Sequence, residues 1–452
     1  MGREVGHLRG FLNWDQCPST RESVCDKFAR LLSYRDDVTR RLKHPSSKEC
    51  AKSVSDWRRK LRGSDFHSGI VAVTSLAMII VALCTLVPVA VDVARASAGS
   101  TASGLTSGSG LDLHSISGDR YGVRTSIHVL TFSGPQYSLE VGLANHGVDG
   151  GLETPSTMCR STPGCVAAVN GDFFDVTRQG RFDPGDEVGG VIQNCVLLHT
   201  PEIAHQQANL EGQSVNEGLN WSSSIDVNGV NVPITAVNQE LPMRYLNVNL
   251  PLAGTLLFTS PFALRTPTAA GRLTYEFIEV NGTASPTTIN TTAELELVAT
   301  TTTPVRVTSG HVDVSAPAGS TLATLQVGDT VTLTTTSTAG CNNIGGHPIL
   351  LNDGVVVPID PSDTYMAKRY ARTVIGWTGS GTTVIIMVAG RDAQSGATGY
   401  QLVRLLRSLK VVTALNLDGG NSTALYAAGR IYFHAGRVER PVSTGLLVVR
   451  NP

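Results

Sequence analysis

Hydrophobic and polar residues alternate in short runs along most of the chain after Thr125, which is the pattern of half-buried β-strands. The run Thr125–Phe132 is the first clear example. Between Pro201 and Ala339, short runs rich in Thr and Val recur about every ten residues, with turn residues between them. Strands are predicted in this stretch at Leu295–Ala299, Val305–Thr308, His311–Val314 and Thr330–Thr334. We therefore expect a β-rich stretch inserted between the segments that flank it.

The pattern changes after Gly340, where strand and helix periods alternate. A predicted strand, Thr383–Ala389, is followed by a predicted helix, Gly399–Lys410, and by a second strand, Val411–Leu417. The packing side of this helix consists of Leu402, Val403, Leu405, Leu406 and Leu409. The pattern predicts an α+β fold with mixed, β-rich sheets and a few packing helices.

Residues 69–91 have a different pattern, a run of 23 residues without a charged side chain. A helix of about 20 apolar residues spans a bilayer, and the basic residues before this run place residues 1–68 in the cytoplasm. Residues 69–91 are either a single-pass anchor or a signal segment that is cleaved near Ala98, among small residues. The length favours the anchor, because the apolar runs of signal peptides have about 7–15 residues. Both interpretations export the rest of the chain.

The charge balance supports this division. Residues 1–68 contain 15 Lys and Arg against 9 Asp and Glu, a net charge of +6, whereas residues 69–452 contain 21 against 28, a net charge of −7. We expect a basic cytoplasmic tail at 1–68, a Ser- and Gly-rich linker at 92–120 and one folded domain at 121–452. The exported part is acidic and has no basic stripe, which excludes nucleic acid as a partner.

Four cysteines lie in the exported part, an even number that suits disulfide formation in an oxidising compartment. They are Cys159, Cys165, Cys195 and Cys341. Five residues with a Pro-Gly turn separate the first two, which favours a local bridge and leaves Cys195 for Cys341. A zinc site is the alternative, but the CxxC spacing of many such sites is absent.

The segment Thr413–Leu425 is the strongest candidate for chemistry, because an apolar strand ends there in Asp418, Gly419 and Gly420. Glycines carry no side chain, so a ligand can come close to the backbone beside the carboxylate. Short donors and acceptors follow at Asn421, Ser422 and Thr423. The alternative interpretation is a strand-to-helix turn in which the aspartate is only a cap.

Three further segments share features of this one. The segment Val166–Phe174 is an apolar strand that ends in Asn170, Gly171 and Asp172, followed by two aromatic residues. In the second segment a glycine pair precedes His347, and in the third Arg372 stands at the start of a predicted strand.

Taken in order, the four segments resemble the phosphodiester glycosidase family, and the resemblance runs from about Ser126 to Val449. It includes Gly396–Tyr400 before the predicted helix and Arg440–Gly445 near the end. The resemblance implies a single catalytic domain, exported or membrane-tethered, that cleaves a sugar from a phosphodiester in envelope or extracellular glycans. The alternatives are an ordinary exo-glycosidase on the same scaffold and a catalytically silent carbohydrate-binding protein of the cell surface.

This chemistry requires that the phosphate be held and that positive charge at the anomeric carbon be stabilised, while a phosphate needs little protonation to leave. Asp172 and Asp418 are the candidates for general base or nucleophile, and Arg372 is the candidate for phosphate contact through its planar fork. Each has a structural alternative, a turn or cap for the aspartates and a salt bridge for the arginine. The candidate substrate-binding residues are Asn170, Gly171, Gly419, Gly420, Asn421, Ser422, Asp392, Arg440 and His347.

No cofactor is expected, because the sequence has no P-loop and no GxGxxG motif before a βαβ unit. Asp175, Asp183, Asp186 and Glu187 form an oxygen-rich group that suits Ca²⁺, but their spacing does not match an EF-hand loop. A solvated acidic loop is the favoured interpretation.

Overall fold

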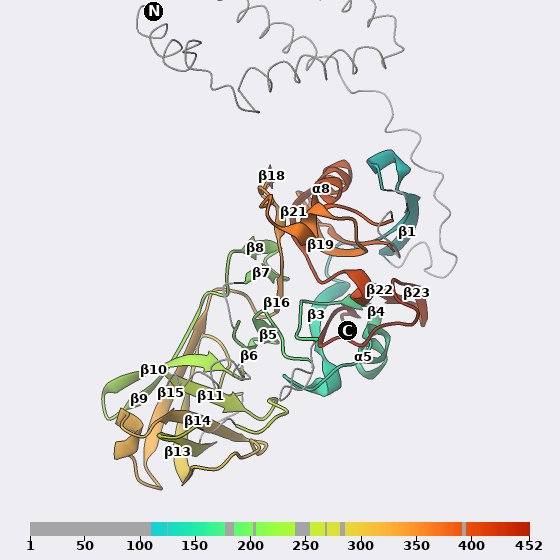
Figure 1. Ribbon diagram of the computed structural model, residues 1–452. Helices are drawn as coiled ribbons and strands as arrows, with labels where there is room; N and C mark the ends of the chain where they lie inside the picture. The colour runs from blue at the N-terminus through green and yellow to red at the C-terminus, as the bar shows by residue number, and fades with distance from the viewer. Residues whose placement is uncertain are drawn as a thin grey trace, which may run out of the picture. The chain divides into compact units, whose positions relative to one another are not determined.

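The computed structural model describes residues 110–123, 125–176, 185–201, 205–239, 254–266, 269–280, 285–390 and 395–452 (Figure 1). These residues lie in one compact unit, Ala98–Pro452. The predicted tail at 1–68 and the predicted membrane segment at 69–91 lie outside the described residues and stay predictions. No helix within the described ranges is long and apolar enough to cross a membrane.

A seven-stranded sheet combines strands from both ends of the described chain. In the order of pairing it consists of β1 (Leu111–Ser117), β2 (Ser126–Phe132), β20 (Thr383–Val388), β19 (Arg372–Thr378), β21 (Val411–Asn416), β17 (Ile349–Asn352) and β18 (Val355–Val356). All neighbouring strands are antiparallel. Strand β1 falls within the linker predicted at 92–120, so the folded part begins earlier than the composition indicates.

Helix α8 (Gly399–Ser408) connects β20 to β21 across β19, which confirms the predicted strand–helix–strand order. A capping box starts the helix: the Thr398 hydroxyl accepts from the Gln401 N–H, and the Gln401 side chain accepts from the Thr398 N–H. Leu402, Leu405 and Leu406 are fully buried in one cluster with strand residues of this sheet. The apolar stripe that the sequence shows is therefore the face that packs on the sheet.

A second, five-stranded antiparallel sheet contains the strand that precedes Asp172. It consists of β23 (Arg430–His434), β22 (Ala424–Ala427), β4 (Cys165–Asn170), β24 (Thr444–Arg450) and β3 (Tyr137–Leu143), in this order. Helix α5 (Pro155–Ser161) packs against β4. The two sheets share one hydrophobic core, which includes Leu130, Ile385 and Leu415 from the first and Val169, Leu425 and Leu446 from the second. This shared core packs the two sheets against each other.

The remaining strands form a third sheet and a barrel. The sheet consists of β6 (Val196–His199), β5 (Val191–Gln193), β16 (Asn343–Gly346), β7 (Gln206–Asn209) and β8 (Ser214–Asn216). The closed barrel consists of β10 (Val230–Val237), β11 (Thr255–Thr259), β14 (His311–Pro317), β12 (Arg272–Glu279), β13 (Thr291–Thr301), β15 (Thr330–Ser337) and β9 (Trp221–Val227). The barrel has its own core, with Ile225, Phe277 and Leu295 among its fully buried residues. Closure leaves no unpaired strand edge.

The predicted α+β class with mixed sheets is wrong, because the fold is strongly β-rich and almost wholly antiparallel. The described residues contain three α-helices, α5, α7 (Thr364–Ala367) and α8, of seven, four and ten residues, beside 24 strands. The pair β10–β11 is the only parallel ladder among these strands. The strand–helix–strand pattern that suggested an α+β fold occurs once, whereas the Thr- and Val-rich stretch before it closes into a barrel. Val305–Thr308, predicted as a strand, contributes only the isolated bridge between Arg306 and Arg265.

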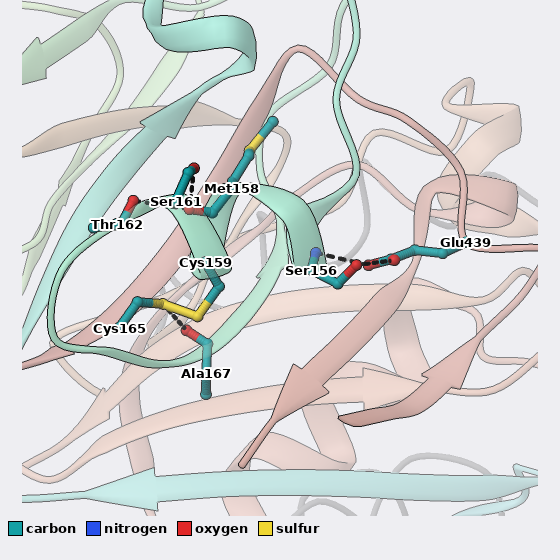
Figure 2. The surroundings of a disulfide bond; sticks show 8 residues. All are labelled: Ser156, Met158, Cys159, Ser161, Thr162, Cys165, Ala167 and Glu439. Carbon is teal, nitrogen blue, oxygen red and sulfur yellow. Dashed lines mark hydrogen bonds between the residues drawn. A yellow bond between two sulfur atoms is a disulfide. The ribbon is translucent and has the colours of Figure 1, made fainter. Parts of the chain in front are cut away.

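Two disulfides join the cysteines in the predicted pairs. Cys159–Cys165 connects α5 to the start of β4 (Figure 2). Cys195–Cys341 joins residues 146 apart, and all seven barrel strands lie between these two cysteines in the sequence. A disulfide stabilises by restricting the unfolded chain, and in the chain-entropy model a loop of about 100 residues gives roughly 4.7 kcal/mol. The long-range bridge is therefore expected to be the more stabilising of the two.

Candidate active site

The ends of β4 and β21 meet, although they belong to different sheets. The Asn170 side-chain amide donates to the Asp418 carbonyl at 2.7 Å, and the Asp418 N–H donates to the Gly171 carbonyl at 3.1 Å. The Thr373 hydroxyl, from β19, which pairs with β21, donates to Asn170 Oδ1 at 2.6 Å. These bonds bring together the two aspartate segments that the sequence analysis identified separately.

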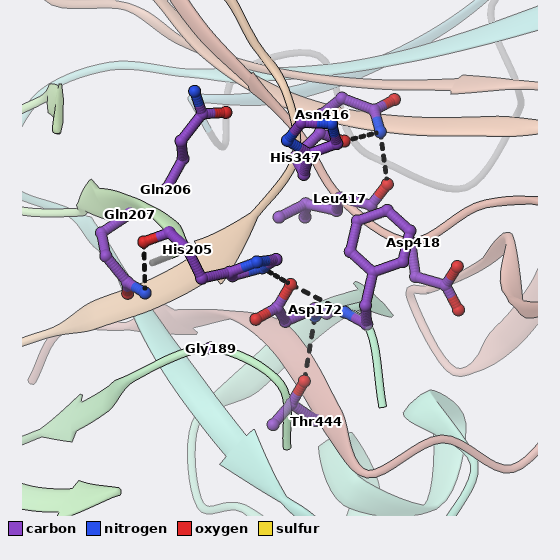
Figure 3. Close-up of polar contacts among 12 residues, drawn as sticks. Asp172, Gly189, His205, Gln206, Gln207, His347, Asn416, Leu417, Asp418 and Thr444 are labelled. Atoms are coloured by element: carbon purple, nitrogen blue, oxygen red, sulfur yellow. Dashed lines mark hydrogen bonds and ion pairs between the residues drawn. The ribbon is translucent and has the colours of Figure 1, made fainter. Parts of the chain in front are cut away.

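Asp172 is buried, and its backbone and side chain make several hydrogen bonds (Figure 3). Its Oδ1 accepts from the Phe173 N–H at 2.7 Å and contacts His205 Nε2 at 2.9 Å, and its own N–H donates to the Thr444 hydroxyl at 3.0 Å. Burial opposes a charge on His205, but the carboxylate and its hydrogen bond outweigh burial and raise the pKa of His205. Asp172 and His205 therefore form a hydrogen-bonded pair.

The sequence analysis did not find His205, because it lies in the stretch interpreted as a β-rich insertion. It precedes β7, and only the pairing of β7 with β16 brings that strand to the site. No periodicity or motif around this histidine distinguishes it from a surface residue.

Two glycines enclose the other carboxylate oxygen of Asp172. A Cβ atom on either Gly189 or Gly345 would collide with Asp172 Oδ2, and the two glycine Cα atoms also lie close to each other. Oδ2 is buried and makes no hydrogen bond to the described residues. The glycine pair before His347 thus has a structural reason, since only a residue without a side chain leaves room for this carboxylate.

Asp418 is only partly buried, and its neighbours differ from those of Asp172. Its Oδ1 accepts from the Gly419 N–H at 2.7 Å. Burial raises the pKa of Asp418 to about 6, against the opposing hydrogen bonds from Ser422 and Gly419 and the charge of Arg440. Arg440 donates to the Ser422 hydroxyl at 3.0 Å and lies over the Phe174 ring at 5.2 Å. Arg440, from the segment before β24, and a carboxylate whose pKa is about 6 thus lie beside the same serine, Ser422.

Arg372, the candidate for phosphate contact, stands at the start of β19. Its side chain is fully buried, and its guanidinium donates to the carbonyls of Tyr365 at 2.5 Å, Lys368 at 3.1 Å and Ala397 at 3.1 Å. The same group lies 4.1 Å from the ring centroid of Tyr365 and 5.4 Å from that of Tyr370. This geometry argues against phosphate contact and favours a structural arginine, bound by carbonyls and rings instead of by the carboxylate expected as the alternative.

Aromatic rings line the same region. Phe173 packs edge-on against His205 at 6.1 Å and against Tyr365 at 5.8 Å, measured between ring centroids. A Cβ on Gly419 would collide with the Tyr365 hydroxyl, so Tyr365 lies directly against the loop that carries Asp418. Tyr365 is a second residue that the sequence analysis missed, and its position depends on the short helix α7.

His347 lies beside this group without joining it. Its backbone is bound to Asn416, which donates to the His347 carbonyl at 2.7 Å (Figure 3). Its ring is half exposed, and Nε2 lies 3.4 Å from Asp363 Oδ2. Among the remaining predicted residues, Asn421 is exposed, Gly420 adopts a left-handed φ of 56°, and Asp392 lies outside the described residues.

The oxygen-rich group comes together only in part. Asp186 and Glu187 lie with His199, and one ligand atom from each falls within 4.8 Å of the others. Asp175 is not part of this group, and Asp183 lies outside the described residues. Burial, reinforced by the charge of Asp186, raises the pKa of Glu187, while burial lowers the pKa of His199 to about 4.

One protein family and several solved structures are similar to parts of this chain. Residues 277–449 match the family model described as phosphodiester glycosidase. Among solved structures, the chain is similar to a hypothetical protein from Synechocystis, with 20% identity and a TM-score of 0.58 over 76% of this chain and 62% of that one. It is also similar to an exported protein from Burkholderia pseudomallei, with 18% identity and a TM-score of 0.55 over 72% of this chain and 74% of that one.

The catalytic domain of zebrafish N-acetylglucosamine-1-phosphodiester alpha-N-acetylglucosaminidase, auto-inhibited by its pro-peptide, aligns with 15% identity and a TM-score of 0.36 over 75% of this chain and 82% of that one. No curated protein matches the chain.

The match of residues 277–449 to the phosphodiester glycosidase family model agrees with the resemblance of the sequence, and this is a family of hydrolases. The Synechocystis and Burkholderia proteins share the fold, and the chain spans 62% of the length of the Synechocystis protein. The family match includes Asp418, Arg440 and Gly345, whereas Asp172 and His205 precede it.

Proposed function

We propose that this protein hydrolyses the bond between the anomeric carbon of a sugar and the phosphate of a glycosyl phosphodiester. The family match of residues 277–449 supports the reaction class. The observation that carries the proposal is the pair of hydrogen bonds that joins Asn170 and Gly171 to Asp418, because it places two carboxylate-bearing strand ends side by side.

In this proposal Asp418 is the general base. A base works best when its pKa lies near the working pH, and the pKa of Asp418 is raised to about 6. Its negative charge also favours the positive charge that develops at the anomeric carbon. In the same loop, a Cβ on Gly420 would meet no atom within 4 Å, so there is open space beside this carboxylate.

His205 and Arg440 act on the phosphate in this proposal. Asp172 favours the protonated imidazole, which can donate a proton or a hydrogen bond to the leaving phosphate oxygen. Arg440 takes the role first expected for Arg372, since its planar fork can bind two phosphate oxygens beside Asp418. Asp172 then acts as a positioning residue through His205.

The test compares a glycosyl phosphodiester with an aryl glycoside of the same sugar. We expect a kcat/KM at least about tenfold higher for the phosphodiester, because only that substrate offers phosphate oxygens to Arg440. An equal or higher value for the aryl glycoside would favour an ordinary exo-glycosidase. Binding of sugar without hydrolysis of either substrate would favour a carbohydrate-binding protein.

We further propose that the enzyme acts outside the cytoplasm on envelope or extracellular glycans. The two disulfides support an oxidising compartment. Protease added to intact cells that produce the full-length chain should digest the domain, and protection from the protease would contradict export. Sequencing the N-terminus of the purified protein distinguishes an intact anchor at 69–91 from cleavage near Ala98.

A further inference from the structure

Asp186, Glu187 and His199 form a buried group that the proposed reaction does not use. His199 ends β6, and the two acids lie in the segment before β5. His199 and Glu187 are 0% and 1% exposed, and a nitrogen or oxygen from each of the three residues lies within 4.8 Å of the others. We propose that these three side chains bind one divalent transition-metal ion.

The orientation of His199 is the first argument. Its Nδ1 lies 2.8 Å from the Gly189 carbonyl, and a carbonyl only accepts, so Nδ1 carries the proton. In a neutral imidazole the lone pair is then on Nε2. This nitrogen is buried, makes no hydrogen bond, and faces Asp186 Oδ1 at 3.8 Å. A backbone carbonyl that fixes the tautomer is the usual partner of a metal-binding histidine.

The spacing of the three side chains is the second argument. Glu187 Oε2 accepts from the Asp149 N–H at 3.3 Å, whereas Oε1 is buried and makes no hydrogen bond. No hydrogen bond joins Glu187 to His199, although a protonated carboxyl would be able to donate to the imidazole. The His199 nitrogen and the Glu187 oxygen are thus both buried without a hydrogen bond, and an ion close to Asp186 would satisfy both.

The donor set indicates the class of metal. Imidazole nitrogen with carboxylate oxygen suits Mn²⁺ or Zn²⁺, whereas Ca²⁺ prefers ligands that are all oxygen. The group differs in this respect from the four-acid Ca²⁺ site considered from the sequence, because His199 supplies a nitrogen ligand and Asp175 is not part of the group.

The position of the group gives the ion a structural role close to Asp172. Glu187 forms a β-bridge with Phe174, and the Val188 N–H donates to the Phe173 carbonyl at 3.1 Å. Gly189, whose carbonyl orients His199, packs directly against the Asp172 carboxylate. An ion bound to Asp186, Glu187 and His199 therefore holds the segment that encloses Asp172.

Metal content and thermal stability of the full-length protein test the proposal. After treatment with EDTA and its removal, we expect uptake of one equivalent of Mn²⁺ or Zn²⁺, measured by inductively coupled plasma mass spectrometry. The Tm should rise by about 5 °C or more at saturating metal, because the ion binds the folded state. Ca²⁺ at the same concentration should give a smaller shift.

Glu187→Gln keeps the shape of the side chain and an oxygen for the Asp149 N–H, and we expect it to weaken metal binding at least about tenfold. The matched control is Asp313→Asn, which makes the same change at another buried carboxyl, 1% exposed and located in β14 of the barrel. This control should bind one equivalent of metal like the wild type.

Three results would overturn the proposal: wild-type protein that takes up neither Mn²⁺ nor Zn²⁺, a response to Ca²⁺ alone, or undiminished binding by folded Glu187→Gln. If Glu187→Gln does not fold, the wild-type titration decides by itself. These readouts do not depend on turnover, so they stand apart from the proposed reaction.

Discussion

Asp172 and Asp418 end strands of similar design, yet the fold surrounds their carboxylates differently. Asp172 is 2% exposed, pairs with His205, and has one oxygen enclosed by two glycines. Asp418 is partly exposed and accepts hydrogen bonds from its own loop, with Arg440 nearby. The local sequence places a carboxylate at a strand end, whereas neighbours from other segments decide which groups it contacts and how far it is enclosed.

Asp418→Asn should have the largest effect on turnover. An amide oxygen can still accept from the Gly419 N–H, so the fold should be preserved while the charge and the basicity are lost. We expect kcat to fall at least about a hundredfold, roughly 2.7 kcal/mol, without a decrease in Tm. A folded variant that keeps more than about a tenth of the wild-type kcat would remove Asp418 from the mechanism and leave Asp172 as the better candidate.

Gly345→Ala tests whether glycines confine the Asp172 carboxylate. The added Cβ would collide with Asp172 Oδ2, and overpacking of this kind costs about 1–3 kcal/mol of unfolding free energy. We expect a lower denaturation midpoint together with a loss of activity. Gly218→Ala is the control, since nothing lies within 4 Å of a Cβ at that position. Equal stability of the two variants would show that Asp172 is not confined as described.

Arg440→Lys and Arg372→Lys should separate substrate binding from structure. Lysine keeps the positive charge of Arg440 but lacks the planar guanidinium that can donate two parallel hydrogen bonds. The kcat/KM for the phosphodiester should therefore fall about tenfold, with little change for an aryl glycoside. At Arg372 the same change removes hydrogen bonds to buried carbonyls, so it should lower Tm and reduce activity on both substrates alike. A selective loss of phosphodiester turnover in Arg372→Lys would restore that residue as the phosphate contact.

The pH dependence of rate should distinguish the two aspartates further. If protonated His205 acts as the acid, the rate falls as the pH rises through the pKa of His205, which Asp172 raises. Asp172→Asn should therefore move the alkaline limb of the kcat/KM profile to lower pH, whereas Asp418→Asn should leave that limb in place. An unshifted limb in Asp172→Asn would exclude His205 as the acid.

The smallest effect concerns stability. The folded-state pKa of Asp418, about 6, lies above the ordinary value of about 3.9, so its contribution to stability is fully present below pH 4 and is lost as the pH rises through 6. The asparagine variant does not titrate at this position. Relative to that variant, the Tm of the wild type should decrease between pH 4 and pH 7, and a constant difference would mean that burial does not perturb Asp418.

Several local features could be predicted from the sequence alone. The limits of α8 and of its flanking strands follow from periodicity, and the cysteine pairs follow from spacing. The two aspartate segments were identifiable because a buried strand followed by glycine is a local pattern. The fold class was not, because one strand–helix–strand unit does not reveal that the long Thr- and Val-rich stretch closes into a barrel.

The sequence by itself thus determined which strand ends carry carboxylates and glycines, since these features depend on neighbouring residues along the chain. Only the tertiary structure decided that Arg372 is buried, that His205 pairs with Asp172, and that His199 joins Asp186 and Glu187. Such contacts depend on strand pairing and on packing between sheets. These bring together residues far apart in the chain, and no local pattern encodes which ones meet.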